Sequence, residues 1–332
     1  MTDKSLFSKK LIQEIKSAKE AKIIQKVKVG KKSKKNELVF FIKPELLEVE
    51  DNQKILNSFQ LISEKFEDFN VKIHGAAIVP GATLEDYGIM NRHYGFINQL
   101  SRLASTMVDE ETRQRIFESL GKKETEDNKI MGGHEFLQSF NTDVDTLSDI
   151  WFAQTANKLR SGFYFIADTF QDQPIILVNG FHPSQLLHFT RENHRILLLL
   201  IHTDADWFDL KFELVGDTFP EKAKPYSIRG ALYNAPARYG QLEVGINTNG
   251  VHLSAGPFEA AYEVVNFFGP LIDLKPEKTP PLAIARAVEA GISQTQALSF
   301  LNNPAFGESD LFSKTENMNT KEAIELAKDH FE

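Results

Sequence analysis

The strongest constraint on the fold is a pair of short apolar runs that suit strands of a buried sheet. The first, 37–42, reads Glu-Leu-Val-Phe-Phe-Ile, and the second, 196–201, reads Ile-Leu-Leu-Leu-Leu-Ile. Branched and aromatic residues favour strands, and both runs are far shorter than the roughly 20 residues that a membrane span needs. We therefore expect a soluble globular protein with an internal sheet and no membrane partner.

Helix and strand patterns alternate around these two runs. Helices are expected at 52–66 and 205–214, with a strand at 71–79 between the first helix and the breaker Pro80-Gly81. The stretch Thr83-Leu-Glu-Asp86 resembles an N-terminal capping sequence for a following helix. No long series of parallel-strand units is present, so the order of elements indicates an α+β sandwich.

A segment of different texture, from about 97 to 194, separates the two halves of this pattern. It predicts a helix at 97–120, a polar linker at 122–128 and a second helix at 142–161. A hairpin formed by 162–170 and 174–178 follows, and then a tight turn at Asn179-Gly-Phe-His182-Pro183. Glycine, proline and asparagine mark the breaks. The tail beyond 268 holds three more helical patterns, at 281–290, 293–301 and 320–331.

Charge is concentrated at the N-terminus. Residues 1–36 hold twelve lysines and three acidic residues, whereas the whole chain has a formal net charge of -8. Apolar residues at helical spacing predict a basic helical arm whose lysines form a solvated face. No aromatic residue follows Phe7 among the lysines, so the stacking platform of a single-strand nucleic-acid site is absent. Contact of this arm with nucleic acid or an anionic surface stays the less favoured alternative.

Cysteine is absent from the chain. Disulfides, thiolate metal sites and cysteine nucleophiles are thereby excluded, and the composition fits a reducing compartment. The first ten residues contain no apolar signal core. We therefore expect a cytoplasmic protein.

Three separated stretches carry the residues that point to a function. Lys43-Pro44 ends the first strand, Gly216-Asp-Thr-Phe-Pro220 leads through a loop to Ser227-Ile-Arg-Gly230, and Asn249-Gly-Val-His-Leu-Ser254 precedes a helix that contains Glu263. In this order and context they resemble the nucleoside diphosphate kinase family, in particular its divergent, longer bacterial and plant-type branch. The resemblance covers 37–96 and 195–268.

The resemblance implies a fold and a division of the chain. It implies a ferredoxin-like α/β sandwich of nucleoside diphosphate kinase type, formed by 37–96 and 195–268, with 97–194 as a helical and hairpin insertion. The arm 1–36 and a helical tail, 269–332, lie outside it. The insertion is an expected surface for a protein partner or for homo-oligomer formation.

The resemblance also implies an activity, in which a histidine takes the terminal phosphoryl group of one nucleotide and passes it to another. His252 matches this nucleophile, and neutral imidazole is a good nucleophile near pH 7. Glu263 matches the group that orients the ring by a hydrogen bond, as the third member of a catalytic constellation does. The expected partners are nucleoside di- and triphosphates.

The remaining site residues are carried over from the same motifs. Lys43, Arg229 and the Thr218 hydroxyl would contact phosphates, which need cations and donors because charge spreads over their oxygens. Asn249 would bind the sugar hydroxyl, and Ser254 completes the histidine motif. Tyr87 matches a tyrosine near the histidine, and Phe96 the aromatic under the base. No dedicated metal site is expected, because Mg²⁺ would arrive bound to the nucleotide.

Three departures weaken the match. Phe212 stands where the family has a second phosphate-binding arginine, and Leu253 and Ala255 replace the glycine and aspartate beside the family's serine. These changes leave a second function open: a non-catalytic module that binds a nucleotide or phosphorylated metabolite. Asp204 and Asp206 suit a helix N-terminus better than a metal pair, and His182 is the one other histidine whose turn suits projection into a nucleotide cleft.

Overall fold

The chain is described here from a computed structural model that covers residues 6–121, 128–160 and 162–331. It divides into two compact units. Unit 1 comprises Met1–Tyr87 and Phe189–Glu332, and unit 2 comprises Gly88–His188. Unit 2 therefore spans most of the expected insertion 97–194. Of the expected polar linker 122–128, all but Asn128 lies outside the described residues.

Unit 1 is built on a five-stranded antiparallel sheet with the order β1-β3-β8-β2-β9. The strands are β1 (Lys22–Gln25), β2 (Asn36–Ile42), β3 (Lys72–Pro80), β8 (Arg195–Thr203) and β9 (Val251–Leu253). Every residue of β2 is buried, and so is every residue of β8 except its first. The strands expected at 37–42, 71–79 and 195–202 are thus confirmed.

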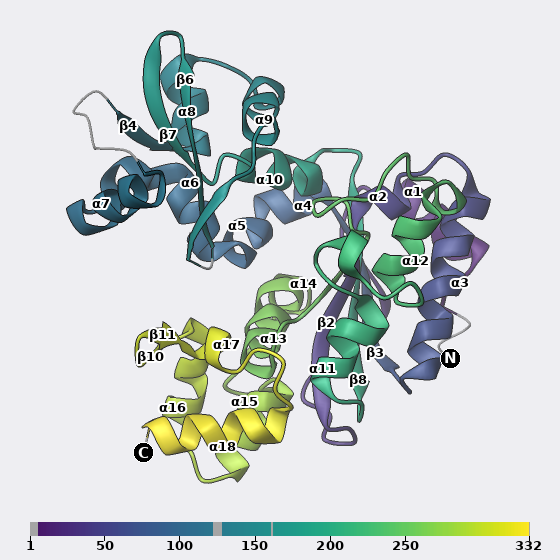
Figure 1. Cartoon of the computed structure of the whole chain (residues 1–332). Helices are drawn as coiled ribbons and strands as arrows, with labels where there is room; N and C mark the ends of the chain where they lie inside the picture. The colour runs from purple at the N-terminus through teal and green to yellow at the C-terminus, as the bar shows by residue number, and fades with distance from the viewer. Residues whose placement is uncertain (1–5, 122–127, 161, 332) are drawn as a thin grey trace. The chain divides into compact units, whose positions relative to one another are not determined.

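Alternation along β2 separates the two faces of this sheet. Leu38, Phe40 and Ile42 point into a core formed with α1 (Lys9–Ser17) and α3 (Asn52–Asp68). Phe41 points to the opposite face, where its ring lies 5.4 Å from that of Phe267. Figure 1 shows α3 beside this sheet. The apolar run is continuous because both faces of the strand are covered.

The other helices of unit 1 follow the sequence pattern with local differences. Thr83–Asp86 lies inside α4 (Gly81–Asp86), whose N-cap is Pro80, so the expected capping role of this stretch is wrong. Over its described residues, from 6 onward, the basic arm is helical in α1 and continues as the edge strand β1. The helix expected at 205–214 is short α11 (Trp207–Asp209), which runs into the π-helix η2 (Leu210–Val215).

The remaining elements of unit 1 connect the strands or form the C-terminal region. Connecting elements are α2 (Pro44–Leu47), η3 (Pro220–Lys222), α12 (Ile228–Asn234) and η4 (Pro236–Tyr239). The C-terminal elements are α13 (Pro257–Glu263), η5 (Val264–Phe268), α14 (Gly269–Ile272), α15 (Leu282–Glu289), α16 (Gln294–Ser299), η6 (Phe300–Asn302), β10 (Ala305–Phe306), β11 (Ser309–Asp310), α17 (Leu311–Lys314) and α18 (Thr320–Phe331). Helices α13, α15, α16, α17 and α18 share a second apolar core with η6 and β10. The three helices expected in the tail are confirmed as α15, α16 and α18.

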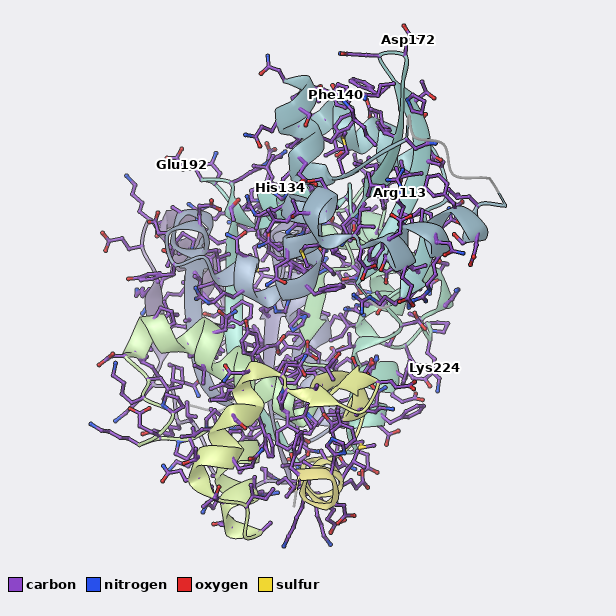
Figure 2. The ribbon with its side chains drawn as sticks, turned by 90° about the vertical axis from the view of Figure 1, so that its left-hand side faces the viewer. Arg113, His134, Phe140, Asp172, Glu192 and Lys224 are labelled. Carbon is purple, nitrogen blue, oxygen red and sulfur yellow. The ribbon has the colours of Figure 1, made fainter. Side chains whose placement is uncertain are left out.

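Unit 2 holds a four-stranded mixed sheet with the order β4-β7-β6-β5. Its elements are α5 (Ile89–His93), α6 (Gly95–Met107), α7 (Glu110–Ser119), β4 (Lys129–Gly132), α8 (Gly133–Phe140), α9 (Val144–Phe152), β5 (Asn157–Arg160), β6 (Phe163–Phe170) and β7 (Gln173–Val178); α10 (His182–Thr190) ends beyond the unit. The expected hairpin is confirmed as β6 and β7. Gln171 and Asp172, both with positive φ, form its turn, and Figure 2 shows Asp172 at the tip.

The structure is therefore mixed α/β. Within the described residues it contains two antiparallel sheets, the five-stranded sheet of unit 1 and the pair β10–β11, and one mixed sheet in unit 2. Within the described ranges, no helix combines the length and the apolar character that crossing a membrane requires.

Candidate active site

His252 lies on β9, at the edge of the unit 1 sheet. It pairs with Phe41 of β2, and the two rings stack with centroids 4.5 Å apart and planes 18° apart. Because paired residues of neighbouring strands point to the same face, His252 lies on the side of the sheet opposite α3. Its side chain is 19% exposed. The imidazole is thus held against an apolar ring and is still reached by solvent.

Glu263 and Ser254 complete a network around this histidine. Oε1 of Glu263 lies 2.7 Å from Nε2 of His252, and Ser254 Oγ donates to Oε2 over 2.5 Å. Glu263 is fully buried and Ser254 is 1% exposed. A buried carboxylate is stabilised by donors on both oxygens, and here it favours the tautomer with the proton on Nε2.

Local sequence explains how the glutamate reaches the histidine. After β9, the Ser254 N–H donates to the Val39 carbonyl, and the Val39 N–H donates to Ser254 Oγ, which continues the pairing with β2. Gly256 is the N-cap of α13 and Pro257 occupies its first turn, where a proline is well tolerated. The helix then carries Glu263 back over the strand.

Lys43 and Asn249 form a second network at the start of β9. Lys43 Nζ donates to Asn249 Oδ1 over 2.7 Å, and the Lys43 N–H donates to the Gly250 carbonyl over 2.9 Å. The Asn249 amide donates in turn to the Thr218 carbonyl. Burial lowers the pKa of Lys43 to about 8, with a further lowering from Arg229 and an opposing effect from Glu45.

Arg229, on α12, joins the loop of the second motif to β9. Its Nη1 donates to the Gly216 carbonyl over 3.1 Å, and its Nη2 donates to the Val251 carbonyl over 2.9 Å. Its Nε is buried and has no hydrogen-bond partner among the described residues. Burial lowers the pKa of Arg229 to about 10, against the opposing effect of Asp217 and Glu45. The guanidinium therefore keeps its charge at neutral pH.

Two glycines and a serine shape the loop that positions Arg229. Gly216 has φ +96°, and a Cβ there would lie 2.4 Å from Ser227 Oγ. A Cβ on Gly230 would lie 2.0 Å from the Lys224 carbonyl oxygen. Ser227 is the N-cap of α12 and accepts from the Gly230 N–H. Each glycine of the motif is thus required by a close approach of the backbone.

Glu45 is a site residue that the sequence reasoning missed. Its Oε1 accepts from the Gly250 N–H over 2.8 Å, and its charge acts on both Lys43 and Arg229. The signal available in the sequence was its position directly after Lys43-Pro44. The buried Lys43, the partly buried Arg229 and the carboxylate that acts on both therefore meet at the same short strand as His252.

The expected nucleotide-binding residues do not all join these networks. Thr218 contributes its carbonyl to Asn249, and its side chain is exposed. Tyr87 is the C-cap of α4 and is 51% exposed. Phe96 belongs to α6 of unit 2, where the Arg160 guanidinium lies 4.7 Å from its ring centroid. Tyr87 and Phe96 thus come from other elements than the β9 networks.

The other residues weighed from sequence have structural partners. Phe212 packs against Phe208, with ring centroids 4.6 Å apart and planes tilted by 48°, so an aromatic pair stands where the family has an arginine. Asp204 pairs with Lys34, and Asp206 is the N-cap of α11, in agreement with a helix N-terminus. His182 is fully buried and lies within hydrogen-bond distance of Asn98 and Gln185, so the suggested projection into a cleft is wrong.

Comparison with known proteins adds no family. No protein-family model matches the chain, and no curated protein matches it either.

Proposed function

We propose that this chain is a nucleotide-dependent phosphotransferase, similar to nucleoside diphosphate kinases, that transfers a phosphoryl group through His252. The observation that carries the proposal is that an oriented histidine, a buried lysine and a partly buried arginine lie at one strand. Glu263 holds the His252 ring, while Lys43 and Arg229 are bonded to residues 249–251 of the same segment.

The chemistry follows from the hydrogen bond on Nε2. With that nitrogen directed at Glu263, Nδ1 is the atom that would attack the terminal phosphorus of a nucleoside triphosphate. A nitrogen–phosphorus bond forms, the bond to the bridging oxygen breaks, and the diphosphate leaves. The reverse sequence on a second diphosphate regenerates the imidazole. Lys43 and Arg229 would offset the charge on the phosphates.

The finer description of the fold is part of this proposal. In the sheet, the strands lie side by side in the order β3-β8-β2-β9. Along the chain, these strands and two of the helices follow one another as β2-α3-β3-β8-α12-β9. This order matches the split βαβ arrangement of ferredoxin-like folds. It supports the assignment of unit 1 to a ferredoxin-like sandwich, with unit 2 inserted between β3 and β8.

Mg²⁺ would enter this site with the nucleotide, since it commonly binds through substrate phosphates and a few protein carboxylates. A cytoplasmic setting fits the cysteine-free sequence.

A binding module without transfer is the second proposal, because one observation favours it. Both polar atoms of the Asn249 amide and both terminal nitrogens of Arg229 are already bonded within the chain. Residues whose polar atoms are already hydrogen-bonded within the chain would hold the shape of a loop that binds the ligand, rather than contact its sugar and phosphates directly. In that case the module would bind a nucleotide or phosphorylated metabolite, with residues 97–194 binding a protein partner or a second copy.

Labelling separates the two proposals. The protein is incubated with γ-labelled ATP and Mg²⁺, and phosphate that is acid-labile and alkali-stable is counted on wild type and on His252→Asn. Transfer requires label on wild type and none on the variant. Absence of label on wild type rejects the phosphotransferase, and a thermal shift with ATP, GTP or ADP then tests the binding module.

A further inference from the structure

Arg102 of unit 2 is an exposed arginine whose guanidinium is held in one orientation. It lies on α6, and its Nε donates to Asn98 Oδ1 over 2.9 Å. A longer bond of 3.4 Å joins its Nη2 to Asn91 Oδ1. Both partners are neutral amides, and Arg102 forms no ion pair with any of the described residues. The guanidinium therefore presents an unneutralised positive charge at the surface.

A buried histidine lies behind this arrangement. His182 is fully buried, and its Nε2 lies 3.1 Å from the same oxygen of Asn98. Because an arginine only donates, the Asn98 amide is fixed with its oxygen toward Arg102, and Nε2 of His182 carries a proton toward that oxygen. One amide oxygen, which has two lone pairs, thus serves a buried ring and an exposed guanidinium.

The titratable groups around Arg102 do not balance its charge. Burial lowers the pKa of His134 to about 3, and Arg102 lowers it further. Burial also lowers the pKa of His182 to about 4, against the opposing effect of Gln185 and with a smaller lowering from Arg102. Both rings are therefore neutral at pH 7. Glu135, next to His134 on α8, already accepts from two backbone N–H groups and from a serine hydroxyl.

An arginine fixed in this way differs from one in a structural ion pair. Fixing a long side chain costs rotamer entropy, and in an ion pair the attraction of the opposite charge offsets part of that cost. At Arg102 the orientation is fixed while the charge stays unpaired. A planar guanidinium so held can donate two parallel hydrogen bonds to a carboxylate or a phosphate with little further loss of freedom.

We propose that Arg102 is the anchor of an oxyanion-binding site in unit 2, which takes a ligand that bears a phosphate or a carboxylate group. One hydrogen of Nη1 and one of Nη2 would bind two oxygens of the same group. Asn98 and the buried His182 would keep the guanidinium in place. The site lies within unit 2 and does not depend on phosphoryl transfer at His252.

The test reads the backbone of α6 directly. The full chain is titrated with inorganic phosphate and, separately, with succinate at pH 7 and constant ionic strength, and the amide signals of 98–102 are followed by NMR. Wild type should show a saturable shift with at least one probe. The probe with the lower half-saturation concentration assigns the ligand group as phosphate or carboxylate. Arg102→Lys keeps the charge but lacks the planar fork, so it should need about fivefold more probe or more.

Asn98→Asp separates the charge of Arg102 from its orientation. The new carboxylate keeps an acceptor for Arg102 and His182 and supplies the missing negative charge. The variant should therefore melt no lower than wild type and lose the response to both probes. Arg115→Lys, at an exposed arginine of α7, is the matched control and should follow wild type.

Any of three results overturns the proposal: no saturable shift of wild type up to about 50 mM of either probe, the same half-saturation for wild type and Arg102→Lys, or an unchanged response in Asn98→Asp. The signals of 98–102 report on unit 2 without a nucleotide. Failure of the labelling experiment would therefore reject the phosphotransferase and leave the site at Arg102 standing, whereas label on wild type with unresponsive α6 signals would do the reverse.

Discussion

Lys43 and Asn249 stand 206 positions apart in the sequence, and their side chains meet in a hydrogen bond of 2.7 Å. The bond joins the end of β2 to the segment that carries His252. Burial of the ammonium lowers the pKa of Lys43 to about 8. A lysine with this pKa is charged at neutral pH and loses its charge within the alkaline range that most proteins tolerate.

The affinity for ATP should therefore fall as pH rises from 7 to 9, because deprotonated Lys43 no longer attracts phosphate. Lys43→Met should weaken binding at pH 7 by about tenfold or more and remove this part of the pH dependence. Calorimetric titration at pH 7 and pH 9 measures both effects. Lys10→Met, at an exposed lysine, should leave affinity unchanged. Equal affinities for wild type and Lys43→Met would show that Lys43 serves only Asn249.

His252→Asn should abolish labelling by γ-labelled ATP without loss of fold, because its side chain is partly exposed and its backbone pairing with β2 is retained. His330→Asn, on α18, is the matched histidine control and should keep full labelling. Label that persists on His252→Asn would assign the phosphate to another residue.

Ser254→Ala should lower the free energy of unfolding by about 1–3 kcal/mol, because it removes the buried hydroxyl that accepts from the Val39 N–H and donates to one oxygen of Glu263. Urea denaturation gives the value. Ser17→Ala removes an exposed hydroxyl and should change stability by less than about 0.5 kcal/mol. A similar small change in Ser254→Ala would mean that water replaces the hydroxyl.

Phe212→Arg tests the departure from the family pattern directly. Phe212 is partly exposed and packs against Phe208, so an arginine is expected to be accommodated. If the family's phosphate site is retained, the added guanidinium should raise ATP affinity about tenfold or more, as a charge-assisted hydrogen bond does. Phe208→Arg is the control one turn earlier. An equal gain in both variants would indicate a general charge effect instead.

Acid should destabilise unit 2 through two histidines, the buried His182 and the partly buried His134. His134 and His182 lie 5.6 Å apart by ring centroids, and burial lowers their pKa values to about 3 and about 4. Figure 2 marks His134. The unfolded chain binds protons near pH 6.5, so stability conferred by the neutral rings is lost as pH falls from 6.5 toward these values.

The two tryptophans make this loss measurable, since Trp151 lies in unit 2 and Trp207 in unit 1. Urea unfolding of Trp207→Phe follows Trp151, and its midpoint should drop between pH 7 and pH 5. The double variant His134→Gln with His182→Gln should show a flatter response. A midpoint for Trp151 that does not change with pH would contradict the assigned protonation states.

Local sequence patterns determined many of the strands, turns and helix caps of this protein. The two apolar runs form β2 and β8. They are apolar throughout because both faces of these strands are buried, so neither face needs polar residues. The turns and caps followed from residue chemistry: Gly216 adopts a positive φ, Ser227 begins α12, and the β6–β7 hairpin turns where its pattern breaks. The prediction from sequence was wrong where a local pattern is compatible with more than one structure. Thr83 fits an N-cap, but α4 already begins at Gly81, directly after the strand, so Thr83 lies inside the helix.

Only the tertiary structure decided which polar residues share a network. The sequence alone contains the three motifs but not the bond that joins Lys43 to Asn249, because it depends on strands that pair across more than a hundred residues. The bond from Arg229 to Val251 spans 22 positions and depends on where α12 is placed relative to β9. Glu45 was missed for the same reason. Its contact with the Gly250 N–H and its effect on Lys43 and Arg229 arise when the folded chain brings these groups together.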